Sequence, residues 1–286
     1  MFELTQRQIE QFNEDGFLIV DKLIDEATAD ALHERYERMF RGEFESGIRP
    51  DEVNWREGES DPSLTRQICN GWKGDRLLAS VVLREDLGRA VATLGGWSGA
   101  RVMQDNVLWK PPGTRPLGYH QDNAYLSWFR PGEIMTCWIA LDETHADAGT
   151  IEFARGSHKW AQLPPEGEFH GPTEYRKYME QAAAREGVEP DIVYVEVPKG
   201  GGSFHHGRMW HGSGNNTAKV PRRSLVLHAM PAAAEYNSDH LDAGIGPIYG
   251  RYKRLADDVM DENYFPILWR DDGYRSPVLD MFISGK

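Results

Sequence analysis

The chain has 286 residues, of which 40% are hydrophobic and 27% charged, and its formal net charge is −13. This apolar content is enough for a sizeable core and excludes a disordered chain. The acidic balance argues against a nucleic-acid partner and against binding to an anionic membrane surface, because both require clustered Lys and Arg.

Targeting signals and cysteines indicate the compartment. No run of about 18 apolar residues is present to cross a membrane, and the first residues, Met1-Phe2-Glu3-Leu4-Thr5, do not resemble a secretion signal. The two cysteines, Cys69 and Cys137, form neither a disulfide framework nor a zinc-type spacing. We therefore expect a cytoplasmic protein that does not associate with a membrane.

The first third of the chain is predicted to be mainly helical. Thr5 is a good N-cap, and Asp15-Gly16 is a typical helix end. Apolar periodicity predicts helices over residues 5–15, 24–40 and 76–95. The apolar run Phe17-Leu18-Ile19-Val20 indicates a buried strand, and the polar segment 41–63 a long loop.

From residue 100 the pattern changes to short β-type runs separated by Gly and Pro, which predicts a sandwich or barrel. The candidate strands are 101–110, 117–122, 134–141, 149–154, 192–197, 202–206, 209–213 and 223–230. An insert at 161–190 contains a helical piece over 173–185, and it is either a lid, a binding loop or a surface excursion. We expect one domain over residues 1–286, with N-terminal helices 5–95, a β core 100–230 and a C-terminal extension 231–286.

A histidine and an aspartate stand two residues apart in Gly118-Tyr119-His120-Gln121-Asp122. On a β-strand such a pair projects to one face, because side chains alternate with a period of two. His211, in Trp210-His211-Gly212-Ser213-Gly214, offers a third ligand 91 positions later (211 − 120). Two imidazoles and one carboxylate, with open positions opposite, form the facial triad of non-heme Fe(II) oxygenases.

Each of these residues also has an ordinary structural interpretation. His120 can be a surface histidine after a turn, Asp122 can cap a turn, and His211 can satisfy a core hydrogen bond. His205 and His206 compete with His211 for the third position. A glycine interrupts the segment that carries all three histidines, so strand parity does not choose between them.

An arginine supports the oxygenase interpretation. Arg222 follows His211 by 11 positions (222 − 211). A hairpin joining residues 209–213 to 223–230 would bring Arg222 near the metal strand. A guanidinium binds a carboxylate through two hydrogen bonds and stays charged when buried, so Arg222 is a candidate partner for the far carboxylate of an iron-chelating oxo-acid. Ser213, on the same face as His211, is either a second donor to that carboxylate or a surface turn serine.

Together these motifs resemble the phytanoyl-CoA dioxygenase family of Fe(II)/2-oxoglutarate-dependent oxygenases. The resemblance is carried by His120-Gln121-Asp122, by WHGSGNN at residues 210–216 and by Arg222. Further matching segments, in the family's order, are QIEQFNEDGF at 8–17, WIALD at 138–142, GTI at 149–151 and GSHK at 156–159. The resemblance extends from about residue 5 to 230, and Arg155 stands where the family usually has a proline.

The resemblance implies a mainly β fold with flanking helices, a double-stranded β-helix or cupin-like jelly roll, with the metal at its open mouth. The implied iron ligands are His120, Asp122 and His211. The implied partners of the distal 2-oxoglutarate carboxylate are Arg222 and Ser213. Two further positions match the walls of the 2-oxoglutarate pocket, namely Asn106 and Trp138.

The implied enzyme is a dioxygenase that uses Fe(II), 2-oxoglutarate and O₂ to hydroxylate an aliphatic C–H group, with release of succinate and CO₂. Related halogenases carry a small residue in place of the metal carboxylate, so the presence of Asp122 disfavours halogenation. Three residues near the motif are candidates for contacting the substrate or, alternatively, for the core: Gln104, Tyr125 and Trp128.

A small-molecule metabolite is the expected substrate, because CoA carries several negative charges and this acidic chain shows no obvious basic patch. The alternatives are an acyl-CoA hydroxylase of the same family and a non-oxygenase, cupin-like metal-binding protein. In the second case Arg222 would have no carboxylate to bind. The apolar tail at 261–269 covers the pocket, packs on a partner subunit or fills a core groove. The sequence leaves the oligomeric state open.

Overall fold

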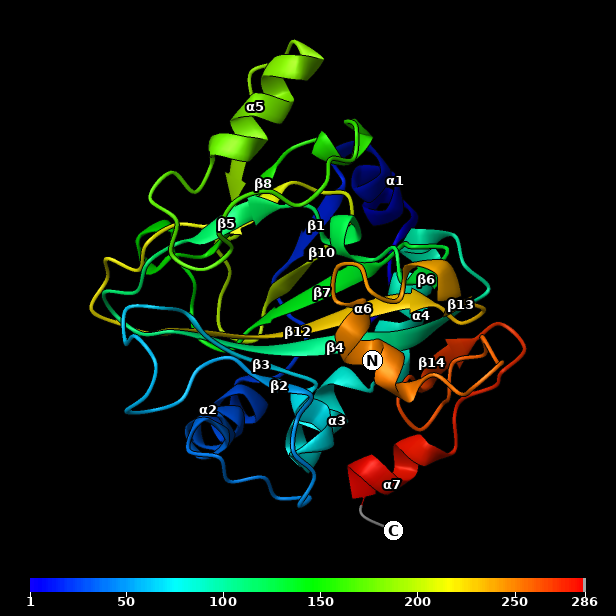
Figure 1. Cartoon of the computed structure of the whole chain (residues 1–286). Helices are drawn as coiled ribbons and strands as arrows, with labels where there is room; N and C mark the ends of the chain where they lie inside the picture. Colours follow the sequence, from blue (N-terminus) through cyan, green and yellow to red (C-terminus); the bar gives the residue numbers. More distant parts are fainter. Residues whose placement is uncertain (285–286) are drawn as a thin grey trace.

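The computed structural model describes residues 1–284 of the chain (Figure 1). Its helices are α1 (Gln6–Asp15), α2 (Glu26–Phe40), α3 (Arg76–Val82), α4 (Glu85–Gly95), α5 (Lys177–Glu186), α6 (Gly246–Tyr249) and α7 (Val278–Ser284). Helix α1 begins with the predicted cap, because the Thr5 side chain accepts from the Gln8 N–H in a capping box. Gly16, at a φ of 81°, ends it in the left-handed conformation that glycine adopts easily.

The strands form a large and a small antiparallel sheet. The large sheet runs β1 (Phe17–Val20), β10 (Gly202–His206), β7 (Met135–Ala140), β12 (Arg222–Pro231), β4 (Gly99–Lys110), β3 (Arg66–Cys69) and β2 (Glu52–Val53), with β14 (Ile267–Arg270) also on β4. The small sheet runs β5 (Leu117–His120), β11 (His211–Ser213), β8 (Ile151–Ala154) and β9 (Ile192–Tyr194). A separate pair joins β6 (Phe129–Arg130) and β13 (Glu235–Tyr236). This arrangement confirms the predicted mainly β jelly roll with flanking helices (Figure 1).

The two faces of the large sheet differ in chemistry because strand side chains alternate. On β12, Leu225 and Leu227 are buried in a core shared with α2, α3 and α4. Arg222, Val226 and His228 point to the opposite face, where they line a cavity between the two sheets. The helices therefore cover an apolar outer face, and the polar residues gather inside the roll.

One predicted helix is two helices. The pattern over 76–95 is interrupted after α3, and Arg84 has extended backbone angles (φ −66°, ψ 135°) before α4 begins. The Arg84 guanidinium donates to the Leu23 carbonyl at 2.6 Å and to Asp86 at 2.9 Å. These contacts stabilise the break, which the apolar periodicity alone did not reveal.

The C-terminal extension packs against the main sheet. Strand β14 pairs with β4, and Phe265 and Leu268 are buried. Of the three roles considered for the tail at 261–269, the structure therefore supports filling a core groove. Within residues 1–284 no helix is long and apolar enough to span a membrane.

Candidate metal centre

The three candidate ligands come from two neighbouring strands and a turn. His120 ends β5 and faces His211 at the start of β11 in direct register. Asp122 lies beyond the strand, as the first residue of a 3₁₀ turn over Asp122–Tyr125. The sequence argument placed His120 and Asp122 on one face of a single strand, and this was wrong. The turn, not the strand pleat, directs the carboxylate toward the imidazoles.

That turn is fixed by hydrogen bonds to the segment before β11. The Asn123 N–H donates to the Gly207 carbonyl at 2.9 Å, and the Gln121 side chain donates to the Arg208 carbonyl at 2.7 Å. The position of Asp122 therefore depends on the same loop that leads to His211.

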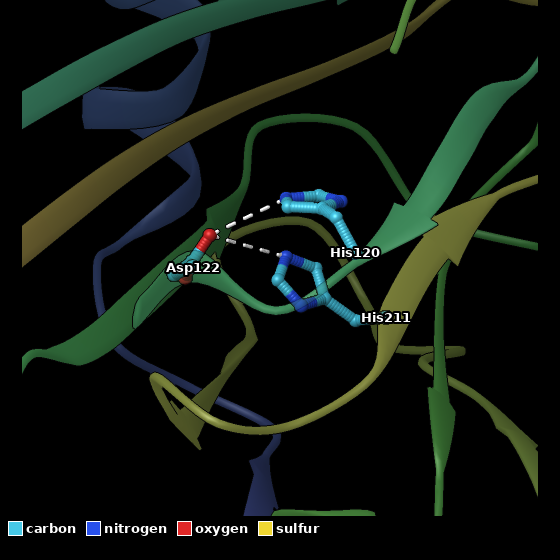
Figure 2. A group of neighbouring side chains, drawn as sticks. All are labelled: His120, Asp122 and His211. Carbon is cyan, nitrogen blue, oxygen red and sulfur yellow. Dashed lines mark ion pairs between the residues drawn. The ribbon is translucent and has the colours of Figure 1, made fainter. Parts of the chain in front are cut away.

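The three side chains converge on one point (Figure 2). Asp122 Oδ1 lies 3.3 Å from His120 Nε2 and 3.7 Å from His211 Nε2. One ligand atom from each residue lies within 4.8 Å of the others, and in the described chain this is the one group of at least three His, Cys, Asp or Glu residues with that property.

The outer nitrogens of both rings are already engaged. His120 Nδ1 lies 3.0 Å from the Gly118 carbonyl, and His211 Nδ1 lies 2.9 Å from the Met209 carbonyl. A carbonyl only accepts, so each Nδ1 carries the hydrogen and each Nε2 presents a lone pair inward. Two imidazole nitrogens and one carboxylate oxygen suit Fe(II) with open positions, so the residues present fit an iron ion.

The pKa shifts of His211 and Asp122 agree with a role as metal ligands. Burial lowers the pKa of His211 well below its ordinary value, and neighbouring His120 lowers it further, which keeps the ring neutral. Burial alone would raise the pKa of Asp122, but the neighbouring histidines, chiefly His211 and His228, outweigh it and hold that pKa well below its usual range. The aspartate is therefore ionised and the histidine is not, as metal binding requires.

His205, left open as a competing ligand, faces the other oxygen of the same carboxylate. Its ring is buried, and its Nε2 lies 3.4 Å from Asp122 Oδ2. His206 points elsewhere, and its Nδ1 accepts from the Arg208 N–H at 3.0 Å. Of the three competing histidines, His211 therefore groups with His120 and Asp122, and His205 and His206 do not.

Two residues that sequence reasoning missed hold Asp122 Oδ2. Thr136 Oγ1 donates to Oδ2 at 3.1 Å, and Thr136 Oγ1 in turn lies 2.8 Å from His228 Nδ1. His228 Nε2 accepts from the Asn106 side-chain amide at 3.0 Å. Both missed residues follow strand parity: Thr136 is two residues before Trp138, and His228 is six after Arg222.

The same chain of hydrogen bonds continues to the C-terminal extension. Gln104 and Gln67 both donate to Asn106 Oδ1, at 3.1 and 3.2 Å. The hydroxyl of Tyr249, in α6, donates to Gln104 Oε1. In this series each residue donates to the next one on the way to Asp122. The orientation of the carboxylate is therefore linked to residues far from it in the sequence.

Arg222 is close to Ser213, but the predicted hairpin does not exist. β11 pairs with β5 and β8, whereas β12 pairs with β4 and β7 in the other sheet. The two residues meet because the sheets face each other, with Arg222 Nη2 3.5 Å from Ser213 Oγ. The guanidinium also donates to the Gly149 carbonyl at 2.8 Å and to Ser224 Oγ at 2.9 Å.

The cavity between the sheets brings the predicted co-substrate residues together. Its walls include the three candidate ligands together with Asn106, Trp138, Ser213 and Arg222. Arg222 is fully buried, and no carboxylate of the described chain lies within ion-pair distance of it. Burial lowers the pKa of Arg222 to about 10, which still leaves it charged at neutral pH. A buried cation of this kind favours an anionic ligand.

A second cavity of about 280 Å³ adjoins the first at His120 and Asp122. Gln104 and Tyr125 line it, together with Phe169 and His170 from the insert at 161–190. The Phe169 ring lies 4.9 Å from the His120 ring, so part of the insert covers the candidate metal centre.

The third substrate candidate, Trp128, borders neither cavity. It is fully buried in an aromatic cluster, with its ring 5.3 Å from that of Tyr249 and 4.8 Å from that of Phe129. Trp128 therefore supports the pocket from behind.

Comparison with known proteins gives a match over most of the chain. The family model for phytanoyl-CoA dioxygenase (PhyH) matches residues 12–224. Human peroxisomal phytanoyl-CoA dioxygenase is 25% identical over 253 residues, covering 82% of this chain and 70% of the human protein.

Solved structures show the same fold. The 2-oxoglutarate-dependent carbocyclase SnoK from nogalamycin biosynthesis superposes with a TM-score of 0.71 at 22% identity, covering 93% of this chain and 96% of SnoK. The epimerase SnoN, in complex with Fe³⁺, 2-oxoglutarate and a nogalamycin, gives a TM-score of 0.69 at 20% identity, covering 92% of this chain and 98% of SnoN.

Proposed function

The chain belongs to the phytanoyl-CoA dioxygenase family and is an Fe(II)/2-oxoglutarate-dependent dioxygenase, and from this premise we propose that it hydroxylates an aliphatic C–H group of a small-molecule metabolite. The observation that carries the proposal is the arrangement of the first cavity. The three candidate ligands and the guanidinium of Arg222 border the same cavity, and no carboxylate of residues 1–284 lies within ion-pair distance of that guanidinium.

We assign iron binding to His120, Asp122 and His211, and binding of the distal 2-oxoglutarate carboxylate to Arg222 and Ser213. When bound, iron(II) with 2-oxoglutarate and O₂ supplies the oxidation, in which the co-substrate is converted to succinate and CO₂. The protein contributes position: three ligands leave room on the metal for the chelating co-substrate. Asn106 and Trp138 close the walls of the cavity around it.

We place the substrate in the second cavity, which meets the first at His120 and Asp122. Neutral amides, Tyr125 and apolar side chains form much of its wall, and no Lys or Arg of the described chain lines it. A CoA thioester carries several phosphate charges that need such cations. The lining therefore favours a small metabolite without a large anionic group, and Phe169 and His170 help to exclude water.

Substrate-stimulated succinate release tests the proposal. Iron-loaded protein is supplied with 2-oxoglutarate and O₂ and is then screened against neutral small metabolites and, separately, against acyl-CoA thioesters. We expect stimulation only by members of the first set. Stimulation by acyl-CoA alone would favour the acyl-CoA hydroxylase, and a hydroxylated product must accompany the succinate for the reaction type to stand.

A further inference from the structure

A second buried cation lies beside Arg222. Lys110 is the last residue of β4, and in the β4–β12 ladder it stands directly opposite Arg222. The exposed fraction of Lys110 is 0% and that of Arg222 is 1%. Two like charges at opposed strand positions repel each other, and the repulsion is stronger away from water.

Among residues 1–284 neither Lys110 nor Arg222 has a carboxylate as a direct partner. Lys110 Nζ donates to Ser213 Oγ at 3.1 Å and to the Gly214 carbonyl. Within residues 1–284 no carboxylate lies within 4.0 Å of Lys110 Nζ or of the Arg222 guanidinium. In the described chain both side chains are hydrogen-bonded only to neutral oxygens, so the positive charge of the pair is offset only from a distance, by Glu152 and Asp142.

The buried carboxylate whose charge acts on Lys110, Glu152, is already occupied. It accepts hydrogen bonds from Tyr119, Tyr175, Arg176 and the Gly214 N–H. One of these donors, Arg176, is itself a cation and offsets the charge of Glu152. Burial lowers the pKa of Lys110 well below its ordinary value, the charge of Arg222 lowers it further, and Glu152 opposes both effects only in part.

Packing holds the lysine against Ser213, which lines the first cavity, whereas Lys110 itself is not part of that lining. The backbone of Gly149 has a φ of 66°, and a Cβ there would lie 2.8 Å from the Gly214 carbonyl and 3.0 Å from Lys110 Cε. Glycine at this position allows the lysine stem to pass beneath Ser213. Ser213 Oγ then contacts both cations, at 3.1 Å from Lys110 Nζ and 3.5 Å from Arg222 Nη2.

We propose that Lys110 is a positioning residue of the co-substrate site: it holds the Ser213 hydroxyl and adds positive charge behind it, at the end of the cavity where Arg222 and Ser213 would bind the distal carboxylate of 2-oxoglutarate. This inference rests on the proposed function. A dicarboxylate brings to this end of the cavity the negative charge that two opposed cations lack. A 2-oxo acid without that second carboxylate leaves the repulsion in place, so Lys110 selects for the dicarboxylate.

Anaerobic titration of the iron-loaded protein tests the role of Lys110. The visible absorption band of the Fe(II)–oxo-acid chelate gives the Kd of each of two probes. The first is 2-oxoglutarate, and the second is 2-oxopentanoate, in which a methyl group replaces the distal carboxylate. Lys110→Met removes the charge and the donor, whereas Lys110→Gln removes the charge and keeps a donor for Gly214. Lys219→Gln, at an exposed lysine, is the matched control.

We expect Lys110→Gln and Lys110→Met to weaken 2-oxoglutarate binding by about 10- to 100-fold, the range for loss of a charged hydrogen bond. The Kd of 2-oxopentanoate, the affinity for Fe(II) alone and the Lys219→Gln control should stay at wild-type values. Equal weakening of both oxo acids would reveal a purely structural lysine, and an unchanged 2-oxoglutarate Kd would also overturn the proposal. Should Lys110→Met not fold, the Gln variant decides alone. Wild-type protein that binds iron but gives no chelate band with 2-oxoglutarate would instead contradict the proposed function.

Discussion

The inner and outer faces of the large sheet are built from the same strands but have different roles. On β12, β7 and β4 the outward residues are mainly apolar, as with Leu227 and Ile139, and they pack against the helices. The inward residues of the same strands include the polar or charged His228, Thr136 and Arg222, beside apolar residues such as Trp138 and Val226. The outer face therefore provides stability, and the inner face keeps polar groups in place at an energetic cost that bound ligands offset.

The strongest test of this division replaces a carboxylate on each side. Asp122→Ala should reduce substrate-stimulated succinate release to background, because one iron ligand is lost, while the thermal unfolding midpoint stays close to that of the wild type. Asp142→Ala is the matched control, since Asp142 binds the outward-pointing Arg223 at 3.1 Å. Its succinate release per folded molecule should be unchanged. Wild-type turnover by Asp122→Ala would remove the basis of the iron assignment.

Neighbouring residues on β12 test the stability side of the division. Leu227→Ala empties part of the outer core and should lower the free energy of unfolding by about 2–5 kcal/mol. Val226→Ala points into the first cavity and should cost less, because its side chain already borders a cavity. Urea denaturation measures both variants, and equal losses would contradict the distinction between the faces.

Loss of a hydroxyl beside the candidate iron ligand should have an intermediate effect. Thr136→Val keeps the shape of the side chain but removes the donor to Asp122 Oδ2. We expect Fe(II) affinity to fall by about 10- to 100-fold, the range seen when partners of metal ligands are removed. Thr136→Ser should restore most of it, and wild-type metal affinity in the Val variant would show that the hydroxyl does not position Asp122.

The last expected effect is a change in the pH dependence of stability, caused by a buried acid on the outer face of β4. Burial raises the pKa of Asp105 from 3.8 to about 8. Between these values the folded chain holds a proton that the unfolded chain has released, so the free energy of unfolding falls as pH rises from about 4 to about 8.

In Asp105→Asn this slope should be shallower, by up to about 1.4 kcal/mol per pH unit for one proton. Denaturation across the range measures it. Identical slopes in the two proteins would show that Asp105 does not titrate in this way.

The difference between the two faces of the sheet also explains which features could be predicted from the sequence. The outer face was predictable, because alternation and helical periodicity follow from burying apolar surface, and most strands lie where the pattern placed them. The candidate ligands were predictable from residue type and spacing. Their supports were not: the contacts of Asp122 with Thr136 and of Gln104 with Tyr249 join segments far apart in the chain. The false hairpin had the same origin, because adjacency in sequence does not determine which sheet a strand joins.

The position of β12 in the sheet has a consequence for how the chain is made. β12 inserts between β7 and β4, two strands that the ribosome delivers earlier. Until residues 222–231 emerge, those strands present unpaired edges, which are prone to association with other chains. The strand that closes this gap also carries Arg222 and His228. A nascent chain therefore gains Arg222, its proposed partner for the distal 2-oxoglutarate carboxylate, in the same step that completes the large sheet. A product truncated before β12 lacks this residue and with it the proposed co-substrate site.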